Sequence, residues 1–431
     1  MTVHADLYAR HRAVLPDWVA LYYDEPIELV RGEGRRVWDG QGNSYLDMFG
    51  GILTTMLGHA VPEVVTAVQQ QAERMLHTST LYLNRPMVEL AEEVAAKAPF
   101  PDAKVFFTTS GSEANELAML LACTARASNQ VLALRNSYHG RSYATMGVTG
   151  NRSWSASSLS PVNVNYVHGG YRYRSPWQEA DDAAYMDACV DDLRSVIETA
   201  TAGDVACMIV EPVQGVGGFT HPPDGTFAAM KQVLDEYGII LISDEVQTGW
   251  GRTGDTFWGI EAHEIAPDIM TFAKGIGNGL SMGGVVAPAG LMDSVNANSI
   301  STFGGNPLSA AGALATLRYL NEHDIQANVR KVSAQLREPL GALSEQLPAI
   351  GEVRGKGLMI GVDFVDPGTT KPAPQTAAAA LEAARRRGIL IGTGGRYGNV
   401  LRIAPPLTLT TEEASEAVAG ITDAIEEAAA V

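Results

Sequence analysis

Apolar runs that turn polar at their ends alternate with helical patterns through the middle of the chain. Four such runs, rich in β-branched and aromatic residues, occupy 104–110, 131–140, 205–215 and 239–249. The segments Ser112–Arg126 and Gly225–Gly238 place apolar residues three and four positions apart, as in an amphipathic helix. Buried strands that alternate with helices predict an α/β fold, with a mostly parallel sheet covered by helices on both faces.

The two ends of the chain show different patterns. Residues 1–60 contain strand-like pieces separated by turn glycines, and residues 309–431 contain long helical patterns. One of these, Thr376–Gly388, has basic residues in its last turn and a glycine after it, which is typical of a helix C-terminus. We expect residues 61–308 to form a large domain and the two ends to form a smaller α+β domain together. The stretch 168–187 has no clear period and is expected to be a long excursion.

Polar residues after each strand are site candidates, because ligands of such sheets bind beyond the carboxyl ends of the strands. Ser110, Gly111 and Ser112 follow the first run and precede a helix. Free N–H groups at a helix N-terminus, with hydroxyls beside them, can hold a phosphate. Ser110 and Glu113 also have the S-x-x-E spacing of a capping box, and the local sequence alone favours the cap.

Two further positions indicate a cofactor. Asp244 stands at the tip of a buried run, where a carboxylate needs a cationic partner unless it caps the next helix. Lys274 ends the apolar run 268–274 and precedes a string of glycines. It is either a surface lysine or a desolvated amine that attacks a carbonyl. A phosphate, a ring nitrogen and a carbonyl point together to pyridoxal phosphate, which a lysine holds as a Schiff base.

Composition and charge limit the classes of molecule that the chain is expected to bind. The 431 residues carry a net charge of −18, which disfavours nucleic acid and anionic lipid but leaves room for a small anionic ligand in a locally positive pocket. Three well-separated cysteines predict neither a disulfide framework nor a zinc site, and we expect no metal. No run is long enough to span a membrane, and the first residues lack the apolar core of a signal peptide. We therefore expect a soluble cytoplasmic protein.

Several longer blocks carry a resemblance to a known family. They are FFTTSGSEANELAML, NSYHGR, IVEPVQGVGG, LISDEVQTGWGRTG, PDIMTFAKGIGNG, STFGGNP and VRGKGLMIG, in this order between Gly42 and Pro406. The chain resembles the class-III, fold-type-I aminotransferases that depend on pyridoxal phosphate, and its motifs are most similar to the alanine–glyoxylate (β-aminoisobutyrate–pyruvate) branch. The resemblance implies a seven-stranded sheet of the type found in this family, and a homodimer.

The resemblance also implies residue roles. Lys274 would bind the cofactor and move the substrate proton, and Asp244 would pair with the ring nitrogen. Gln247 would bond the phenolic oxygen, and Val246 and Tyr138 would cover the two ring faces. Thr302 would reach the phosphate of the neighbouring subunit. The full set of expected cofactor contacts is Ser110, Gly111, Ser112, Tyr138, His139, Glu211, Asp244, Val246, Gln247, Lys274 and Thr302.

Three residues are expected to hold the substrate. The resemblance assigns Arg402 to the α-carboxylate, with a structural ion pair as the alternative. It assigns Glu211 to neutralising Arg402 when a substrate lacks that carboxylate. Arg141 follows HG, where the alanine–glyoxylate branch often lacks arginine and the γ-aminobutyrate and acetylornithine branches have it. Arg141 therefore either binds a remote carboxylate or is a surface residue.

We expect a ping-pong transamination from an α-, β- or ω-amino acid to pyruvate or glyoxylate. The alternatives are a γ-aminobutyrate- or acetylornithine-type enzyme that uses 2-oxoglutarate, and a biosynthetic amine transferase acting on a larger metabolite. An aminomutase on the same scaffold and a non-catalytic effector-binding module are weaker alternatives. The module is disfavoured because the chain retains Lys274, Asp244 and Gln247 and lacks a basic nucleic-acid-binding segment.

Overall fold

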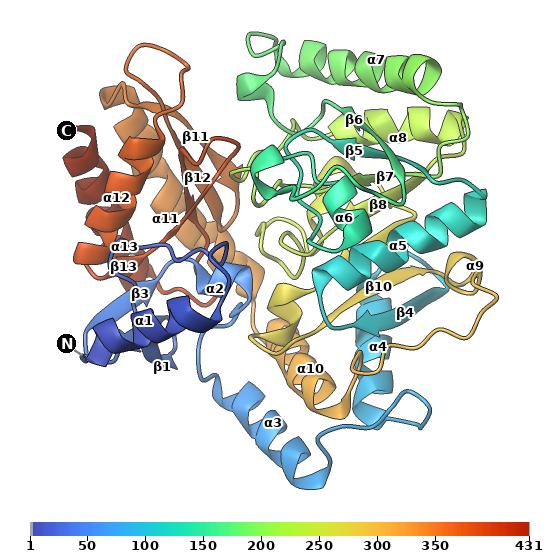
Figure 1. Cartoon of the computed structure of the whole chain (residues 1–431), viewed down its shortest axis with the longest axis horizontal. Coiled ribbons are helices and arrows are strands. Elements are labelled where there is room, and N and C mark those ends of the chain that lie inside the picture. Colours follow the sequence, from blue (N-terminus) through green and yellow to red (C-terminus); the bar gives the residue numbers. More distant parts are fainter. Residues whose placement is uncertain (1–2, 431) are drawn as a thin grey trace.

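The computed structural model describes residues 3–430, which form a larger and a smaller part lying side by side (Figure 1). The larger part is built on one seven-stranded sheet. In it, β10 runs antiparallel to β4 and β9, and the pairs from β9 across to β6 are parallel. The predicted α/β fold with a mostly parallel sheet is thus confirmed. The strand order is β4 (Ala103–Thr108), β10 (Gly283–Pro288), β9 (Ile269–Phe272), β8 (Ile240–Asp244), β7 (Cys207–Val210), β5 (Gln130–Leu134) and β6 (Asn163–Val167).

Helices cover both faces of this sheet because its strands are apolar on both sides. In β5, Val131 and Ala133 belong to the buried cluster that contains residues of α5 (Gly111–Arg126). The alternate residues, Leu132 and Leu134, belong to the cluster that contains α7 (Asp182–Ala200) and α8 (Thr226–Glu236). This alternation follows from the two-residue period of a strand. Because β9, β8, β7, β5 and β6 run parallel, their carboxyl ends share one edge of the sheet.

The smaller part joins the two ends of the chain (Figure 1). One sheet has the order β1 (Leu29–Glu33), β2 (Arg36–Asp39), β3 (Ser44–Asp47) and β13 (Ile389–Leu390). In it β3 pairs in parallel with β13, so that Leu46 lies opposite Ile389. The other sheet has the order β11 (Ile350–Lys356), β12 (Met359–Phe364), β15 (Val400–Ile403) and β14 (Gly392–Gly394). The main helices here are α1 (Val3–Val14), α11 (Ile325–Gln346), α12 (Pro374–Arg386) and α13 (Thr411–Ala429).

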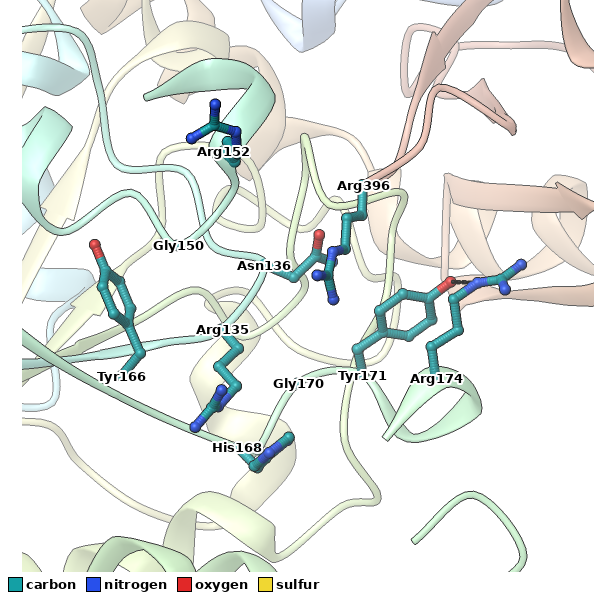
Figure 2. Close-up of a pocket in the computed structure, with 11 residues that line it drawn as sticks. Arg135, Asn136, Gly150, Arg152, Tyr166, His168, Gly170, Tyr171, Arg174 and Arg396 are labelled. Atoms are coloured by element: carbon teal, nitrogen blue, oxygen red, sulfur yellow. Dashed lines mark hydrogen bonds between the residues drawn. The ribbon is translucent and has the colours of Figure 1, made fainter. Parts of the chain in front are cut away.

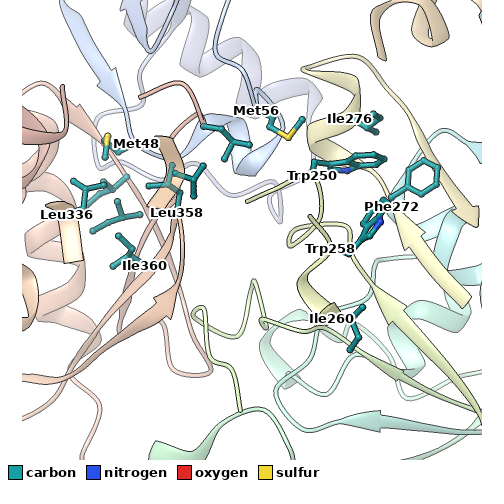
Figure 3. Close-up of a cluster of buried hydrophobic side chains, with 14 of the residues drawn as sticks. Met48, Met56, Trp250, Trp258, Ile260, Phe272, Ile276, Leu336, Leu358 and Ile360 are labelled. Carbon is teal, nitrogen blue, oxygen red and sulfur yellow. The ribbon is translucent and has the colours of Figure 1, made fainter. Parts of the chain in front are cut away.

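One apolar cluster extends through both parts. Figure 3 shows Met48, Leu336 and Leu358 in the smaller part, with Trp250 and Phe272 in the larger part. All five side chains are at most 2% exposed, so burial of this area holds the two parts together. The remaining elements are α2 (Gly50–Leu53), α3 (Pro62–Arg74), α4 (Arg85–Lys97), α6 (Tyr143–Gly147), η1 (Arg152–Trp154), η2 (Arg172–Arg174), η3 (Gly259–His263), η4 (Lys274–Gly277), α9 (Ala289–Met292) and α10 (Pro307–Glu322).

Some local expectations differ from the structure. The predicted excursion 168–187 contains η2 and then becomes helical at Asp182, where α7 begins after its N-cap Asp181. The stretch was therefore wrongly assigned at its end, because the Asp cap was not recognised. The domain boundaries at 60 and 308 stay a prediction, and α10, which crosses the second one, packs against α3 and α4. None of the helices in residues 3–430 is long and apolar enough to cross a membrane.

Candidate active site

Lys274 begins a short 3-10 turn directly after β9. Its φ is +47°, a left-handed conformation that costs a lysine free energy and is maintained by the surrounding fold. Part of its surface stays accessible, yet burial of the amine is the main cause that lowers its pKa to about 7. The charge of Arg402 lowers this pKa further, and Asp244 and Glu211 oppose both effects. At neutral pH a large share of Lys274 is a free amine, which is the nucleophilic and basic form.

Asp244 ends β8 and is 4% exposed. Its Oδ2 accepts hydrogen bonds from Asn115 Nδ2 at 2.7 Å and from His139 Nδ1 at 2.8 Å. Its Oδ1 accepts from the Val246 backbone N–H at 3.1 Å, a bond within its own turn. Three donors around one buried carboxylate fix its direction.

Asn115 was missed by the sequence reasoning. It lies in the second turn of α5, is 1% exposed, and bonds both the His139 carbonyl and Asp244 through Nδ2. Its Oδ1 accepts from Thr271 Oγ1 at 2.7 Å, which ties β9 to the same network. A polar residue on the apolar face of a predicted helix, three positions after Ser112, is the signal that could have identified it.

Glu211 lies just after β7 and is 3% exposed. Its carboxylate accepts from the Tyr138 N–H at 2.8 Å and from the Gly215 N–H at 2.9 Å. Burial is the main cause that raises its pKa to about 7; His139 opposes this shift and Asp244 adds to it. Glu211 is thus held by two backbone donors and fixes the position of Tyr138. No ion pair between Glu211 and Arg402 is formed within residues 3–430.

Arg402 lies in the middle of β15 and is 2% exposed. The residues opposite it on the two neighbouring strands are glycines, Gly361 and Gly392, which leave room for its side chain. Its guanidinium lies 4.9 Å from the ring centre of Phe49 and 5.0 Å from that of Phe219. Its Nε and Nη2 are buried and have no acceptor among the described residues. Burial lowers the pKa of Arg402, against the attraction of Tyr22 and Glu211.

The start of α5 shows the expected cap, and its role as a phosphate site stays a prediction. Ser110 caps the helix by accepting from the Glu113 N–H at 3.2 Å, whereas Glu113 reaches back to the Thr109 N–H at 2.7 Å. The glutamate of the capping box therefore bonds the residue before the N-cap and not the N-cap itself. A Cβ at Gly111 would lie 3.0 Å from Val246 Cγ2, a contact that the valine side chain would have to shift to relieve. Ser112 Oγ accepts from the Arg141 N–H at 3.1 Å, which leaves its own hydroxyl proton free to donate.

Of the four remaining candidates, Gln247 and Tyr138 are buried or half-buried, and Arg141 and Thr302 are exposed. Gln247 is 8% exposed, and its Oε1 has no donor among the described residues. Tyr138 packs edge to face on Trp154, with ring centres 5.6 Å apart. Arg141 is exposed, and its guanidinium lies 5.4 Å from the ring centre of Trp18. Thr302 is exposed in the loop before α10, and no hydrogen bond joins its side chain to any other described residue.

Comparison with known proteins decides the family. The class-III aminotransferase family model matches residues 20–425. The chain belongs to the class-III aminotransferases. It is 39% identical to an alanine–glyoxylate aminotransferase 2 homologue of Arabidopsis thaliana over 91% of this chain and 81% of that protein. It is 34% identical to the 4-aminobutyrate aminotransferase of Escherichia coli over 99% of this chain and 100% of that protein.

A solved structure bears on the cofactor. The amine transaminase of an uncultivated Pseudomonas species, in its PLP-bound form, has a TM-score of 0.88 and 31% identity, and the match covers 96% of this chain and 98% of that chain. Class-III aminotransferases depend on pyridoxal phosphate, so this protein is a PLP-dependent transaminase, as predicted.

The side chains of this aminotransferase fit pyridoxal phosphate. A helix N-terminus with a glycine, at which a Cβ would crowd Val246, suits a phosphate. A buried carboxylate whose Oδ1 accepts a single hydrogen bond suits a protonated ring nitrogen, and the Oε1 of Gln247 is a buried polar atom without a partner among the described residues. No group of three or more histidine, cysteine and acidic side chains among the described residues is placed to hold a metal ion.

Proposed function

We propose that the protein moves an amino group from an α-, β- or ω-amino acid to a small keto acid, pyruvate or glyoxylate, in two half-reactions. The observation that carries this proposal is the unpartnered guanidinium of Arg402. A buried charge without an acceptor is costly, and the cost is removed when a carboxylate binds it through two parallel hydrogen bonds. The Arabidopsis relative is named for alanine and glyoxylate, which supports the same choice of substrates.

Lys274 is proposed to hold the cofactor and then to act as base. When bound, pyridoxal phosphate supplies an aldehyde that takes up the amino group and a ring that accepts the electrons of the bond broken at the substrate carbon. The lowered pKa of Lys274, about 7, leaves its Nζ free to remove the proton from the substrate Cα and to return a proton later. Burial supplies this shift, and the nearby charge of Arg402 adds to it.

The other residues are proposed to orient the cofactor. Asp244 keeps the ring nitrogen protonated, while Asn115 and His139 hold its carboxylate in place. Ser110, Gly111 and Ser112 receive the phosphate at the start of α5, so the cap and the phosphate site are one structure. Tyr138 and Val246 cover the ring faces, and Gln247 donates to the phenolic oxygen. Glu211 aims Tyr138 through the hydrogen bond at its backbone N–H.

Glu211 is also proposed to balance Arg402 during the half-reaction with an ω-amino donor. Its pKa of about 7 lets its charge respond to the state of the site. In the structure its two oxygens are held by Tyr138 and Gly215, so such a pairing requires that one of these bonds give way.

A second substrate class, with a remote carboxylate, follows from Arg141. Its guanidinium packs on Trp18 and forms neither an ion pair nor a hydrogen bond among residues 3–430. The E. coli relative is named for 4-aminobutyrate, a donor of this kind. The Trp18 contact suits either role, since a ring that holds a guanidinium also orients it for an anion.

A homodimer is proposed as the working unit, with Thr302 reaching the phosphate of the other subunit. Thr302 lies between the exposed apolar side chains of Ile300 (56%) and Phe303 (60%). Leu81, Tyr82 and Leu83 are 73%, 69% and 99% exposed. Exposed apolar side chains in two loops favour a subunit interface. We propose a cytoplasmic location, in line with the acidic composition and the free cysteines.

The test is the visible absorption spectrum of the purified protein during stepwise addition of substrates. A donor should bleach the yellow band, and pyruvate or glyoxylate should restore it. If 2-oxoglutarate restores it and pyruvate does not, the acceptor proposal is wrong. The variant Arg141→Gln separates the two classes: loss of activity with 4-aminobutyrate but not with alanine assigns Arg141 to a remote carboxylate. A band that no keto acid restores would contradict transamination in favour of a mutase.

A further inference from the structure

A second pocket, apart from the active site, is lined by four arginines. It lies beyond the ends of β5 and β6, has a volume of about 220 Å³, and contains no aspartate or glutamate in its lining (Figure 2). Lys274, Asp244 and Arg402 are absent from its walls. In a chain with a net charge of −18, such a local excess of positive charge is not expected by chance placement.

Three of the arginines have no hydrogen-bonding or charged partner within the described residues, although Arg396 stacks over the ring of Tyr397 at 5.2 Å. The guanidiniums of Arg135, Arg152 and Arg396 form neither an ion pair nor a hydrogen bond there. Arg174, the fourth, is satisfied by Asp363 at 2.7 Å. Figure 2 shows the Arg396 side chain extending toward Asn136 and the Arg135 side chain extending toward His168.

The floor of the pocket offers further donors. Gly169 and Gly170 are buried, and neither backbone N–H has an acceptor among the described residues. Buried backbone donors are nearly always bonded, so two consecutive free ones mark a place for a ligand or ordered water. Burial and the charge of Arg135 lower the pKa of His168, and Asp192 opposes them. The histidine is therefore neutral at pH 7, and the positive charge comes from the arginines.

We propose that this pocket binds a small phosphorylated molecule. Guanidiniums bind phosphate oxygens through paired hydrogen bonds, and the free N–H groups of the two glycines can donate to an oxyanion that comes close to the backbone. Three unpaired positive charges match the charge of a diphosphate better than that of a single carboxylate. The rings of Tyr166 and Tyr171 form apolar walls for the rest of the ligand.

The ligand would act next to the catalytic residues. Asn136 lines the pocket two positions before Tyr138, and its side chain donates to Gln214 at 3.3 Å and to the Gly217 carbonyl at 3.1 Å. Both acceptors lie in the loop that begins at Glu211. A ligand in the pocket would therefore lie against the segment that positions Tyr138. The binding proposal itself does not depend on transamination.

The experiment is a calorimetric titration of the PLP-saturated enzyme with inorganic pyrophosphate at low salt. Saturation with the cofactor fills the phosphate site of the catalytic centre. We expect one saturable site per chain, with binding that weakens as salt is added. Arg135→Gln, Arg152→Gln and Arg396→Gln should each weaken binding by about tenfold, the lower range for a charged hydrogen bond at an accessible site.

Arg74→Gln is the matched control, because Arg74 is an exposed arginine on α3, outside this pocket, and forms no ion pair within residues 3–430. It removes the same charge and should leave binding unchanged. Equal loss in Arg74→Gln, or the lack of a saturable site, would overturn the proposal. Inorganic phosphate and citrate are titrated in the same way. Weaker binding of phosphate than of pyrophosphate supports the proposal. Tighter binding of citrate than of pyrophosphate would show that the pocket does not prefer phosphorylated ligands and would overturn it.

Discussion

Replacing Arg402 by methionine should make the protein more stable and less active. Arg402 is 2% exposed, its Nε and Nη2 have no acceptor among the described residues, and burial lowers its pKa. The folded state therefore disfavours its positive charge. Methionine fills a similar volume without that charge, so the substitution removes a cost that only a bound carboxylate would otherwise remove.

The two magnitudes follow from the surroundings of the guanidinium. Exchange of a buried charge for an apolar side chain stabilises by about 1–4 kcal/mol, and loss of contact with the rings of Phe49 and Phe219, at 4.9 and 5.0 Å, offsets about 1 kcal/mol of this. A rise in Tm of a few degrees is expected. Two charged hydrogen bonds to a carboxylate are worth about 3–5 kcal/mol, so kcat/KM for pyruvate should fall by roughly 10²- to 10⁴-fold.

The assay pairs thermal unfolding without substrate with steady-state kinetics in pyruvate. Arg354→Met is the matched control, because Arg354 is also a buried arginine but is bonded to Asp363 and Glu352. Breaking those pairs should lower the Tm. If Arg402→Met lowered the Tm as Arg354→Met does, Arg402 would be part of a structural ion pair and the assignment to the substrate carboxylate would fail.

Two further predictions concern the network and the lysine. Asn115→Ala removes a donor from Asp244 and an acceptor from Thr271. It should lower kcat/KM by roughly tenfold or more and shift the cofactor absorption band. The control is Asn399→Ala, which removes an equally buried amide in the smaller part and should leave the band unchanged. In the cofactor-free protein the pKa of Lys274 is about 7 in the folded state, against an ordinary value of 10.5. Between these two pH values the unfolded chain binds one more proton than the folded chain, so the free energy of unfolding should rise with pH. Urea unfolding from pH 7 to 10 should show this rise in the wild type and a smaller one in Lys274→Met; equal slopes would mean that the amine is not desolvated.

The strands and the large helices could be predicted from the sequence because local pattern and burial agree there. The run 104–110 became β4, and the apolar period of Ser112–Arg126 became α5, since a strand apolar on both faces and a helix with one apolar stripe can bury these residues only in that way. Gly388 has a φ of +74° just after α12, as its position after a basic last turn predicts. The cap at Asp181 was missed although buried positions follow it at helical spacing in Tyr185, Cys189 and Leu193.

Features that depend on distant residues could not be predicted from the residues alone. Asn115 is far from Thr271 and Asp244 in the sequence, and only the packing of α5 on the sheet brings their side chains within hydrogen-bond distance. The lack of a partner for Arg402 is a property of the whole site, because it depends on where Glu211 bonds instead. Local propensity contains no information about either fact.

The charges of the candidate site explain why both parts of the molecule are needed for it. Asp244 ends β8 and Lys274 follows β9 in the larger part, whereas Arg402 belongs to β15 in the smaller part, yet the charge of Arg402 lowers the pKa of Lys274. A bound carboxylate would neutralise Arg402 and thereby raise the pKa of the lysine, which strengthens it as a base at the moment when substrate is present. In the proposed mechanism, substrate binding and proton transfer are therefore linked through this electrostatic interaction between the two parts, and Arg402→Met should break that link as well as weaken binding.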